Sequence, residues 1–384
     1  MSAALLSLAC LPGALSAVLD LPIWLKNGYS VVDVEVGTPP VAHTLLFDTG
    51  SATTWMIAAK CDGTALCANN SGFNRTGYNE TSSSTAKATG AYGSIDYLGG
   101  MTAGVGMEDV FAFPSAPDTA WNQTFLEAYQ SSWFNIPADG FLGLAFNTIS
   151  DANTTTLVET LLSSGQLDEP KFGLYYGTEL ENTGDSAGEG RLTLGGSHEE
   201  TYVDGDLVWT DLSPADERAQ LWRVDMVSAV GTTSNKTESA VALSGAWGVF
   251  DTGGGRISVP ERLIDDIYAS IGMNWTAIIG GEHLPLCTEF TDAWSIEFNI
   301  GDSSNPSTLV ITGDMLRKPG FATGEDKYCW PPFDPGESDG LFLFGSDFMQ
   351  MRYTVFDFGG FEPSTYKTRI GFGALKDEYR PEHI

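Results

Sequence analysis

The chain has 384 residues, which is long enough for two domains that each bury a core. It carries 19 basic and 50 acidic residues, a formal net charge of −31. Nucleic acid and anionic membranes are negatively charged as well, so this balance excludes both as preferred partners. The acidity is equally consistent with export to acidic surroundings and with a surface that simply stays soluble.

The N-terminus reads as an export signal. Residues 1–17 are uncharged and mostly apolar, and they end in small side chains, which is typical of a secretory signal peptide. This stretch is too short to span a membrane, and the C-terminal residues 380–384 offer no hydrophobic tail for a lipid anchor. We therefore expect a secreted protein without a membrane anchor, in which residues 18–27 form a short segment before the first strand.

The first predicted strands lead to a buried carboxylate. Val alternates with acidic residues over 32–36, which predicts a strand with one buried face. After a turn at 37–40, a strand over 43–47 returns inward, and its apolar residues 45–47 lead directly to Asp48. Burying a carboxylate beside such a run is unfavourable unless the group is hydrogen-bonded or paired. The residues directly after it are Thr49, Gly50 and Ser51.

The rest of the first half reads as further strands with one short helix. Residues 61–85 form a polar loop, and 94–113 form a hairpin around a glycine turn, with Tyr97 near its tip. Residues 138–146 make a buried, glycine-studded strand. Thr156 and Glu159 predict a capping box that starts a helix ending at Gly165. Strands return over 170–210, interrupted by a glycine-rich loop at 182–190.

The second half repeats this order. An apolar run ends at Asp251, 203 residues after Asp48, and continues as Thr252, Gly253 and Gly254. Ser258 and Glu261 predict a second capping box, for a helix that ends at Gly272. Residues 341–345 form a second apolar strand ending in Gly. The spacing from each Asp to the glycine of its apolar strand is 95 and 94 residues, which indicates an internal duplication.

Cysteines and sequons agree with export. Outside the signal segment four cysteines remain, which allow three pairings. We choose Cys61–Cys67 and Cys287–Cys329, because this pairing keeps one bridge in each half. A zinc site is rejected, because the spacings are wrong and no His lies near, so we expect neither a metal nor a cofactor. Seven triplets predict surface glycosylation, at Asn69, Asn74, Asn79, Asn122, Asn153, Asn235 and Asn274.

The repeated motif has a chemical meaning. If each half delivers one Asp to a shared centre, the two carboxylates cannot both ionise easily, so they share a proton. One can then act as general base and the other as general acid, with Asp48 and Asp251 as the pair. Either Asp alone would more often be the cap of a turn, and the matched pair is what favours catalysis.

These motifs resemble those of the pepsin-like aspartic endopeptidases (peptidase family A1), and we identify the chain as a secreted, fungal-type member. The likeness covers nearly all of the chain after the signal and includes Trp55 at the family's usual distance from Asp48. It implies an all-β fold of two lobes, residues 28–207 and 208–384, with a central cleft. A β-hairpin, the flap (residues 94–113), would cover that cleft and carry Tyr97. Tyr92 is the alternative flap tyrosine, because a Gly follows it.

The resemblance also implies an activity. A monomer would hydrolyse a polypeptide at acidic pH, through a water activated between Asp48 and Asp251, and would prefer apolar residues around the cut. Thr49 and Thr252 would tie the two loops together, while Ser51 would donate to Asp48 and Trp55 to the hydroxyl of Tyr97. Gly50 and Gly253 complete the two motifs.

One departure from the family supports an alternative. Gly254 stands where the family usually has Ser or Thr, so Asp251 lacks a hydroxyl donor and should carry the shared proton. The missing hydroxyl is also the main argument for the other function class, a non-catalytic pepsin-like binding or inhibitor protein.

Overall fold

The computed structural model describes residues 16–26, 28–178, 190–213, 220–336 and 338–381. Within these residues the strands form two sheets, one of 13 strands and one of 7. The helices are short and few compared with the strands. The expected all-β class is confirmed.

The strands of the larger sheet, in spatial order, are β11 (Val208–Asp211), β20 (Arg369–Ala374), β19 (Arg352–Asp357), β9 (Lys171–Tyr175), β10 (Gly190–Leu194), β1 (Leu19–Lys26), β2 (Tyr29–Val36), β3 (Val41–Asp48), β8 (Gly140–Gly143), β4 (Trp55–Ile57), β7 (Ala116–Ser131), β6 (Gly100–Phe113) and β5 (Lys87–Tyr97). Those of the smaller sheet are β16 (Ser307–Thr312), β15 (Ser295–Ile300), β12 (Arg223–Thr232), β13 (Glu238–Phe250), β18 (Leu341–Phe344), β14 (Ile257–Pro260) and β17 (Asp334–Gly336). The α-helices are α1 (Leu157–Ser163), α2 (Glu199–Tyr202), α3 (Ile264–Ser270), α4 (Trp275–Ile279), α5 (Phe321–Gly324) and α6 (Ser346–Met349). Single 3-10 turns lie at Glu80–Ser82, Asn147–Ile149, Glu261–Leu263, Cys287–Glu289, Gly313–Leu316, Pro363–Thr365 and Asp377–Tyr379.

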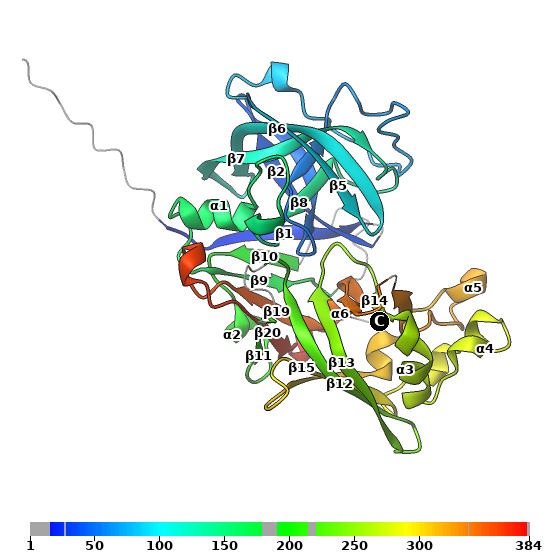
Figure 1. The fold of residues 1–384 in the computed structure, drawn as a ribbon. Helices are drawn as coiled ribbons and strands as arrows, with labels where there is room; N and C mark the ends of the chain where they lie inside the picture. Colours follow the sequence, from blue (N-terminus) through cyan, green and yellow to red (C-terminus); the bar gives the residue numbers. More distant parts are fainter. Residues whose placement is uncertain (1–15, 27, 179–189, 214–219, 337, 382–384) are drawn as a thin grey trace, which may run out of the picture.

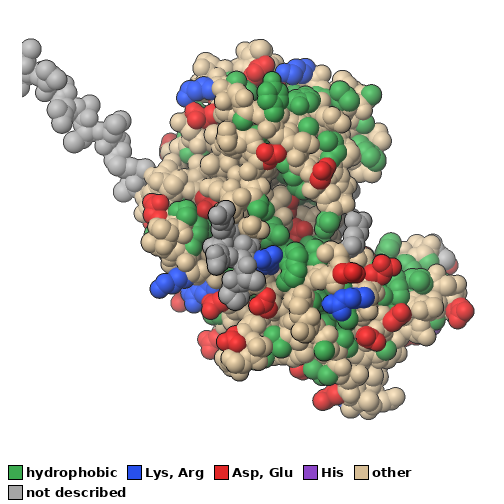
Figure 2. All heavy atoms as spheres, in the orientation of Figure 1, with side chains coloured by type: hydrophobic (Ala, Val, Ile, Leu, Met, Phe, Trp, Pro, Cys, Tyr) green, Lys and Arg blue, Asp and Glu red, His purple; other side chains and the backbone are tan. Residues whose placement is uncertain are grey.

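Two bodies lie on either side of a shared layer. Figure 1 shows an upper body with β2 and β5–β8, a lower body with β12, β13, β15 and α3, and between them β1, β10, β9, β19 and β20. The surface is hollowed between the two bodies (Figure 2). Strands β19 and β20, from the end of the chain, belong to the larger sheet, and the smaller sheet begins only at β12. The expected boundary at residues 207 and 208 therefore does not separate the two sheets.

The duplication is visible in the strand ladders. Strand β3 pairs in parallel with β8, which also pairs antiparallel with β4. In the second half β13 pairs in parallel with β18, which also pairs antiparallel with β14. Asp48 lies opposite Gly143, and the amide of Asp251 donates to the carbonyl of Phe344 at 3.0 Å. The same local arrangement therefore presents each Asp at the end of a buried strand.

The segment at residues 18–27 is different from the expectation. It contains strand β1, which pairs with both β10 and β2. Leu19, Leu21, Ile23 and Leu25 are buried, and the residues between them are less so. This alternation over every second residue is typical of a half-buried strand, so the first strand begins earlier than expected. Residues 1–15 of the expected signal peptide and 182–189 of the expected loop lie outside the described residues.

One of the two predicted capping boxes is wrong and the other is half-formed. Helix α1 has Thr156 as its N-cap, with the side chain accepting from Glu159 N at 3.4 Å. The carboxylate of Glu159 accepts from the Thr156 hydroxyl at 3.5 Å and from Asn147 N at 2.5 Å. It does not accept from Thr156 N, which donates to Oδ1 of Asn147 at 2.6 Å. In the second half Ser258 lies inside β14, and the turn that follows has Pro260 as its N-cap with no side-chain bond. The ladder with β17 holds the backbone of Ser258 as a strand, which overrides its capping preference.

The two expected disulfides, Cys61–Cys67 and Cys287–Cys329, are both present. Six of the seven predicted glycosylation sites have exposed asparagines. Asn69 is half-buried, and its amide nitrogen donates to Phe73 O at 2.9 Å, so this sequon is the least suited to modification. Across the described parts of the chain, no helix is long and apolar enough to cross a membrane.

A buried carboxyl joins α1 to the C-terminal part of the chain. Glu159 is 6% exposed, and its Oε1 accepts from the hydroxyl of Tyr366 at 2.9 Å. Burial is the largest influence on this group and raises the pKa of Glu159 above its ordinary value of 4.5, although hydrogen bonds from Asn147 and Tyr366 oppose the shift. The folded protein therefore holds this proton more tightly than the unfolded chain does.

The raised pKa of Glu159 predicts a pH-dependent stability. Because the folded state binds the proton more tightly, the stabilisation is complete below pH 4.5 and is lost as the pH rises through the folded-state pKa. We expect Glu159→Gln, which cannot ionise, to gain in melting temperature relative to the unaltered protein as the pH rises from 4 to 7. Melting curves of both proteins across this range test it, and parallel curves would contradict it.

Candidate active site

The two Asp-Thr-Gly loops are joined by four hydrogen bonds. Thr49 N donates to Thr252 Oγ1 at 3.0 Å, and Thr252 N donates to Thr49 Oγ1 at the same distance. The hydroxyl of Thr49 donates to Phe250 O at 2.7 Å, and that of Thr252 to Phe47 O at 2.8 Å. Both threonines are fully buried. The strands that carry the loops come from different sheets, so this reciprocal set of bonds fixes the two halves against each other.

This junction brings the carboxyl groups of Asp48 and Asp251 together, in hydrogen-bond contact with each other. The glycines of the two motifs make the approach possible. A Cβ added at Gly50 would lie 2.5 Å from Oδ1 of Asp251, and one at Gly253 would lie 2.6 Å from Oδ1 of Asp48. No real Cβ tolerates such contacts, so any side chain at either position would force the carboxyls apart.

The surroundings of the two carboxyls are unequal. Asp48 accepts from the hydroxyl of Ser51 at 2.5 Å and from Gly50 N at 2.8 Å. Asp251 has the matching bond from Gly253 N at 2.8 Å, but Gly254 supplies no hydroxyl. Burial, followed by the neighbouring Asp48, raises the pKa of Asp251 well above its ordinary value of 3.8. The anion is therefore better stabilised on Asp48 and the proton on Asp251.

The asymmetry can be tested at Gly254. A Cβ there would lie 3.5 Å from Oδ2 of Asp251 and 2.9 Å from Cδ2 of Leu343, a side-chain end that can turn away. We expect Gly254→Ser to place a donor on the Asp251 anion, which lowers the pKa of Asp251 and moves the alkaline limb of the kcat/KM profile to lower pH. Gly254→Ala, which adds the Cβ without the hydroxyl, is the control. An identical shift in both variants, or none, would contradict the assignment.

The flap covers this pair. Strands β5 and β6 pair as an antiparallel hairpin through the register Tyr97↔Gly100. The hydroxyl of Tyr97 accepts from Nε1 of Trp55 at 2.9 Å, and it lies near enough to Asp48 to be affected by the charge of that carboxyl. Burial and the charge of Asp48 raise the pKa of Tyr97, so its hydroxyl stays protonated. Tyr92 is 74% exposed and lies outside this contact, so the structure places Tyr97 over the pair.

The pair opens into a cavity of about 760 Å³ between the two bodies. Both sheets line it, and most of its wall is apolar. The side chains that the motifs did not identify are Ile95, Trp133, Ile149, Leu221, Trp247 and Leu343. Ile95 belongs to the hairpin predicted at 94–113 and Leu343 to the apolar strand predicted at 341–345. The other four lie outside the predicted motifs and reach the cavity only through the fold.

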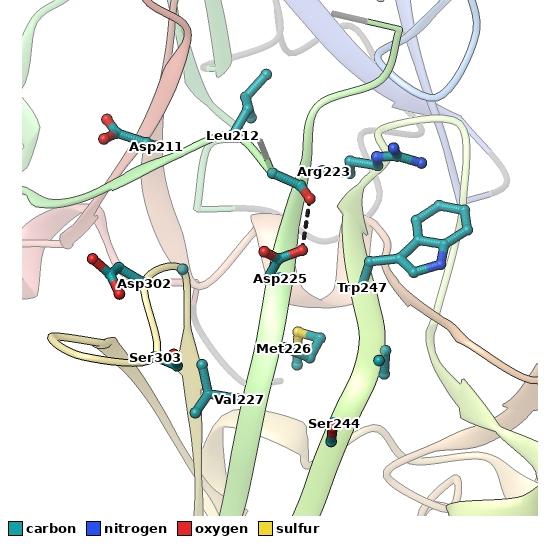
Figure 3. A pocket seen from close by; sticks show the side chains of 14 residues that line it. Asp211, Leu212, Arg223, Asp225, Met226, Val227, Ser244, Trp247, Asp302 and Ser303 are labelled. Carbon is teal, nitrogen blue, oxygen red and sulfur yellow. Dashed lines mark hydrogen bonds between the residues drawn. The ribbon is translucent and has the colours of Figure 1, made fainter. Parts of the chain in front are cut away.

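A second cavity, of about 950 Å³, lies along β12 and β13 (Figure 3). Trp247 lines both, and the guanidinium of Arg223 lies over its ring at 4.9 Å. Figure 3 shows Asp225 accepting a hydrogen bond, which comes from Ser213 at 2.6 Å.

The described residues contain no group of three or more His, Cys, Asp or Glu side chains that could hold a metal ion. The chemistry that the pair itself can perform is proton transfer. One carboxylate can take a proton from a water molecule while the protonated partner gives one to the oxygen of a polarised carbonyl. The geometry and the unequal surroundings suit this division of roles.

Comparisons with known proteins agree with this site. Residues 29–365 match the family model described as eukaryotic aspartyl protease. Gastricsin of Cavia porcellus is 26% identical over 361 residues, which are 93% of this chain and 82% of that protein. Pepsin A of Sus scrofa is 28% identical over 354 residues, 90% of this chain and 83% of that protein. Pepsin B of Canis lupus familiaris is 26% identical over 349 residues, 90% of this chain and 81% of that protein.

Proposed function

Because this chain belongs to the eukaryotic aspartyl protease family, whose pepsins and gastricsins are aspartic endopeptidases, we propose that it is a secreted enzyme that cleaves polypeptides at acidic pH. The observation that carries the proposal is the contact between Asp48 and Asp251 at the floor of the cavity. That the protein belongs to a fungal-type branch of this family stays a prediction.

The proposed reaction uses one proton shared by the pair. Asp48, whose anion accepts from Ser51 and Gly50, takes a proton from a water held between the two carboxyls. The water attacks the carbonyl carbon of the scissile bond, and the proton on Asp251 passes to the carbonyl oxygen. As the C–N bond of this tetrahedral intermediate breaks, Asp48 gives the proton that it took from the water to the leaving nitrogen, and Asp251 recovers a proton from one of the two hydroxyl groups. A pair with one proton is a form that acidic pH favours, since both carboxylates ionise together only at higher pH.

The substrate is an extended peptide lying under the flap. The apolar cavity wall, with Ile95, Ile149 and Leu343, favours apolar side chains around the cut. The cavity has a volume of about 760 Å³, and Trp247 in its wall also lines the second cavity, so we expect several residues of the peptide to be bound at once. We propose that the enzyme acts as a monomer without a cofactor, and that residues 1–17 direct its export.

The test is digestion of a denatured protein at pH 3–5, with and without a statine-type inhibitor that mimics the tetrahedral intermediate. We expect cleavage that the inhibitor abolishes, and mass spectrometry of the fragments then reports the residues around each cut. Binding of the inhibitor without any cleavage would instead support the non-catalytic binding protein that Gly254 suggests. Absence of both would contradict the proposal.

A further inference from the structure

Trp133 lies in the wall of the catalytic cavity and contacts the flap from below. Its ring meets that of Tyr97 edge-on, with 5.6 Å between the ring centroids, and lies 5.1 Å from the ring of Phe141. Tyr97 is the flap residue that accepts from Trp55 and lines the cavity together with the carboxyl pair. A displacement of Trp133 would therefore displace Tyr97, the side chain that lies over the carboxyl pair.

The tip of the flap rests on the same ring. A Cβ at Gly99 would lie 2.7 Å from Cη2 of Trp133, and one at Gly100 would lie 3.1 Å from its Cε2. Neither glycine has the positive φ that would by itself disfavour a side chain. Contact with Trp133, and with Ser132 beside it, is what requires glycine here. The flap tip and the indole are thus packed at the closest distance that two glycines allow.

Backbone bonds join the flap to the segment that carries Trp133. Ser132 N donates to Met101 O at 2.9 Å, and Met101 N donates to the hydroxyl of Ser132 at 2.8 Å. These bonds lie one residue beyond the glycine tip on β6. These two hydrogen bonds between Ser132 and Met101 fix the distance between the flap and the ring of Trp133.

Arg75 holds Trp133 in this place. It is 7% exposed, and its guanidinium donates to three backbone carbonyls: those of Trp133 at 2.5 Å, Ala68 at 3.1 Å and Ala138 at 3.2 Å. A planar guanidinium spans such a set in one fixed geometry, which an ammonium group cannot reproduce. The side chain of Arg75 therefore connects the loop that follows the first disulfide to the wall of the cavity.

We propose that the indole of Trp133 is the surface on which the closed flap rests, which we call the seat. Arg75 is the positioning residue that holds Trp133 at the distance from the flap that this contact requires. The consequence for catalysis rests on the proposed function, whereas the packing of the flap does not. With the seat in place, the flap needs no reorganisation to cover a bound peptide. Without it, the flap remains paired but is held less firmly over the substrate.

The first test is a double-mutant cycle in the full chain. Gly99→Ala places a Cβ against the indole and is expected to raise KM about tenfold, because the flap is pushed off its seat. Trp133→Leu is expected to raise KM about fivefold with kcat changed less than about threefold. In the double variant the Gly99→Ala defect should nearly vanish, because the obstructing ring is gone. Strict additivity of the two effects would overturn the proposal.

The second test does not need activity. We expect hydrogen exchange at amides 94–102 to become faster in Gly99→Ala, Trp133→Leu and Arg75→Lys, and to become slower again when Gly99→Ala is combined with Trp133→Leu. Phe134→Leu is the matched control, because its side chain is 42% exposed and adjacent in sequence, and flap exchange should not change. Unchanged flap exchange in Trp133→Leu would overturn the proposal even in a protein that cleaves nothing.

Discussion

Asp48→Asn and Asp251→Asn are each expected to lower kcat by about 10²–10⁴-fold, the range that general acid–base catalysis supplies. An amide has nearly the size of the carboxyl group but cannot take or give the proton. Asp48→Asn removes the base, and Asp251→Asn removes the acid that burial and Asp48 keep protonated. Both variants should remain folded, because the four bonds of Thr49 and Thr252 do not involve either carboxyl.

A control and a second readout distinguish this from general damage. Asp266→Asn changes the charge by the same amount at an exposed position on α3 and should leave kcat unaltered. Asp251→Asn should also raise the melting temperature relative to the unaltered protein as the pH rises above 3.8, since the folded state no longer has to ionise a buried group. More than about a tenth of the original kcat in either active-site variant would contradict the proton-sharing mechanism.

Replacing Thr49 or Thr252 by Val is expected to reduce the free energy of unfolding by about 2–5 kcal/mol, because each change leaves a buried amide and a buried carbonyl unpaired. In Thr49→Val these groups are Thr252 N and Phe250 O. Urea unfolding measures the loss. Activity should fall as well, since the two loops bring the carboxyls into contact.

Thr49→Ser is the matched control for this prediction. It retains the hydroxyl and both of its hydrogen bonds, and should lose only about 1 kcal/mol for the missing methyl group. The double variant Thr49→Val, Thr252→Val should lose less than the sum of the single changes, because the loops relax once either half is released. Equal effects of Ser and Val at position 49 would show that the hydrogen bonds contribute little.

Much of the candidate site could be predicted because its motif occurs twice. The apolar run before each Asp and the apolar strand ending in Gly repeat with nearly equal spacing, and the structure pairs them in the same register. The expected bonds from Ser51 to Asp48 and from Trp55 to Tyr97 are found in the structure. Because the motif occurs twice, the sequence alone indicated which segments would meet in the folded protein.

What sequence reasoning missed depends on contacts between distant segments. Arg75 looks like an ordinary surface cation in a polar loop, and only its folded position shows three carbonyls around it. Trp133 carries no motif at all. Ser258 has the capping pattern, yet its ladder with β17, whose pairing residue is Asp334, keeps it in a strand. In each case a partner many residues away decides the local outcome, and propensity alone cannot identify that partner.

The strands between the two bodies also determine when, during synthesis, the larger sheet can be completed. Strand β9 has β10 on one side and β19 on the other, so its second neighbour is separated from it by more than 170 residues of chain. During synthesis the first half emerges with this edge of hydrogen-bonding groups open, and such an edge readily accepts a foreign strand. This edge closes only when β19 has been made, so the sheet that the first half begins depends on a strand made much later in synthesis.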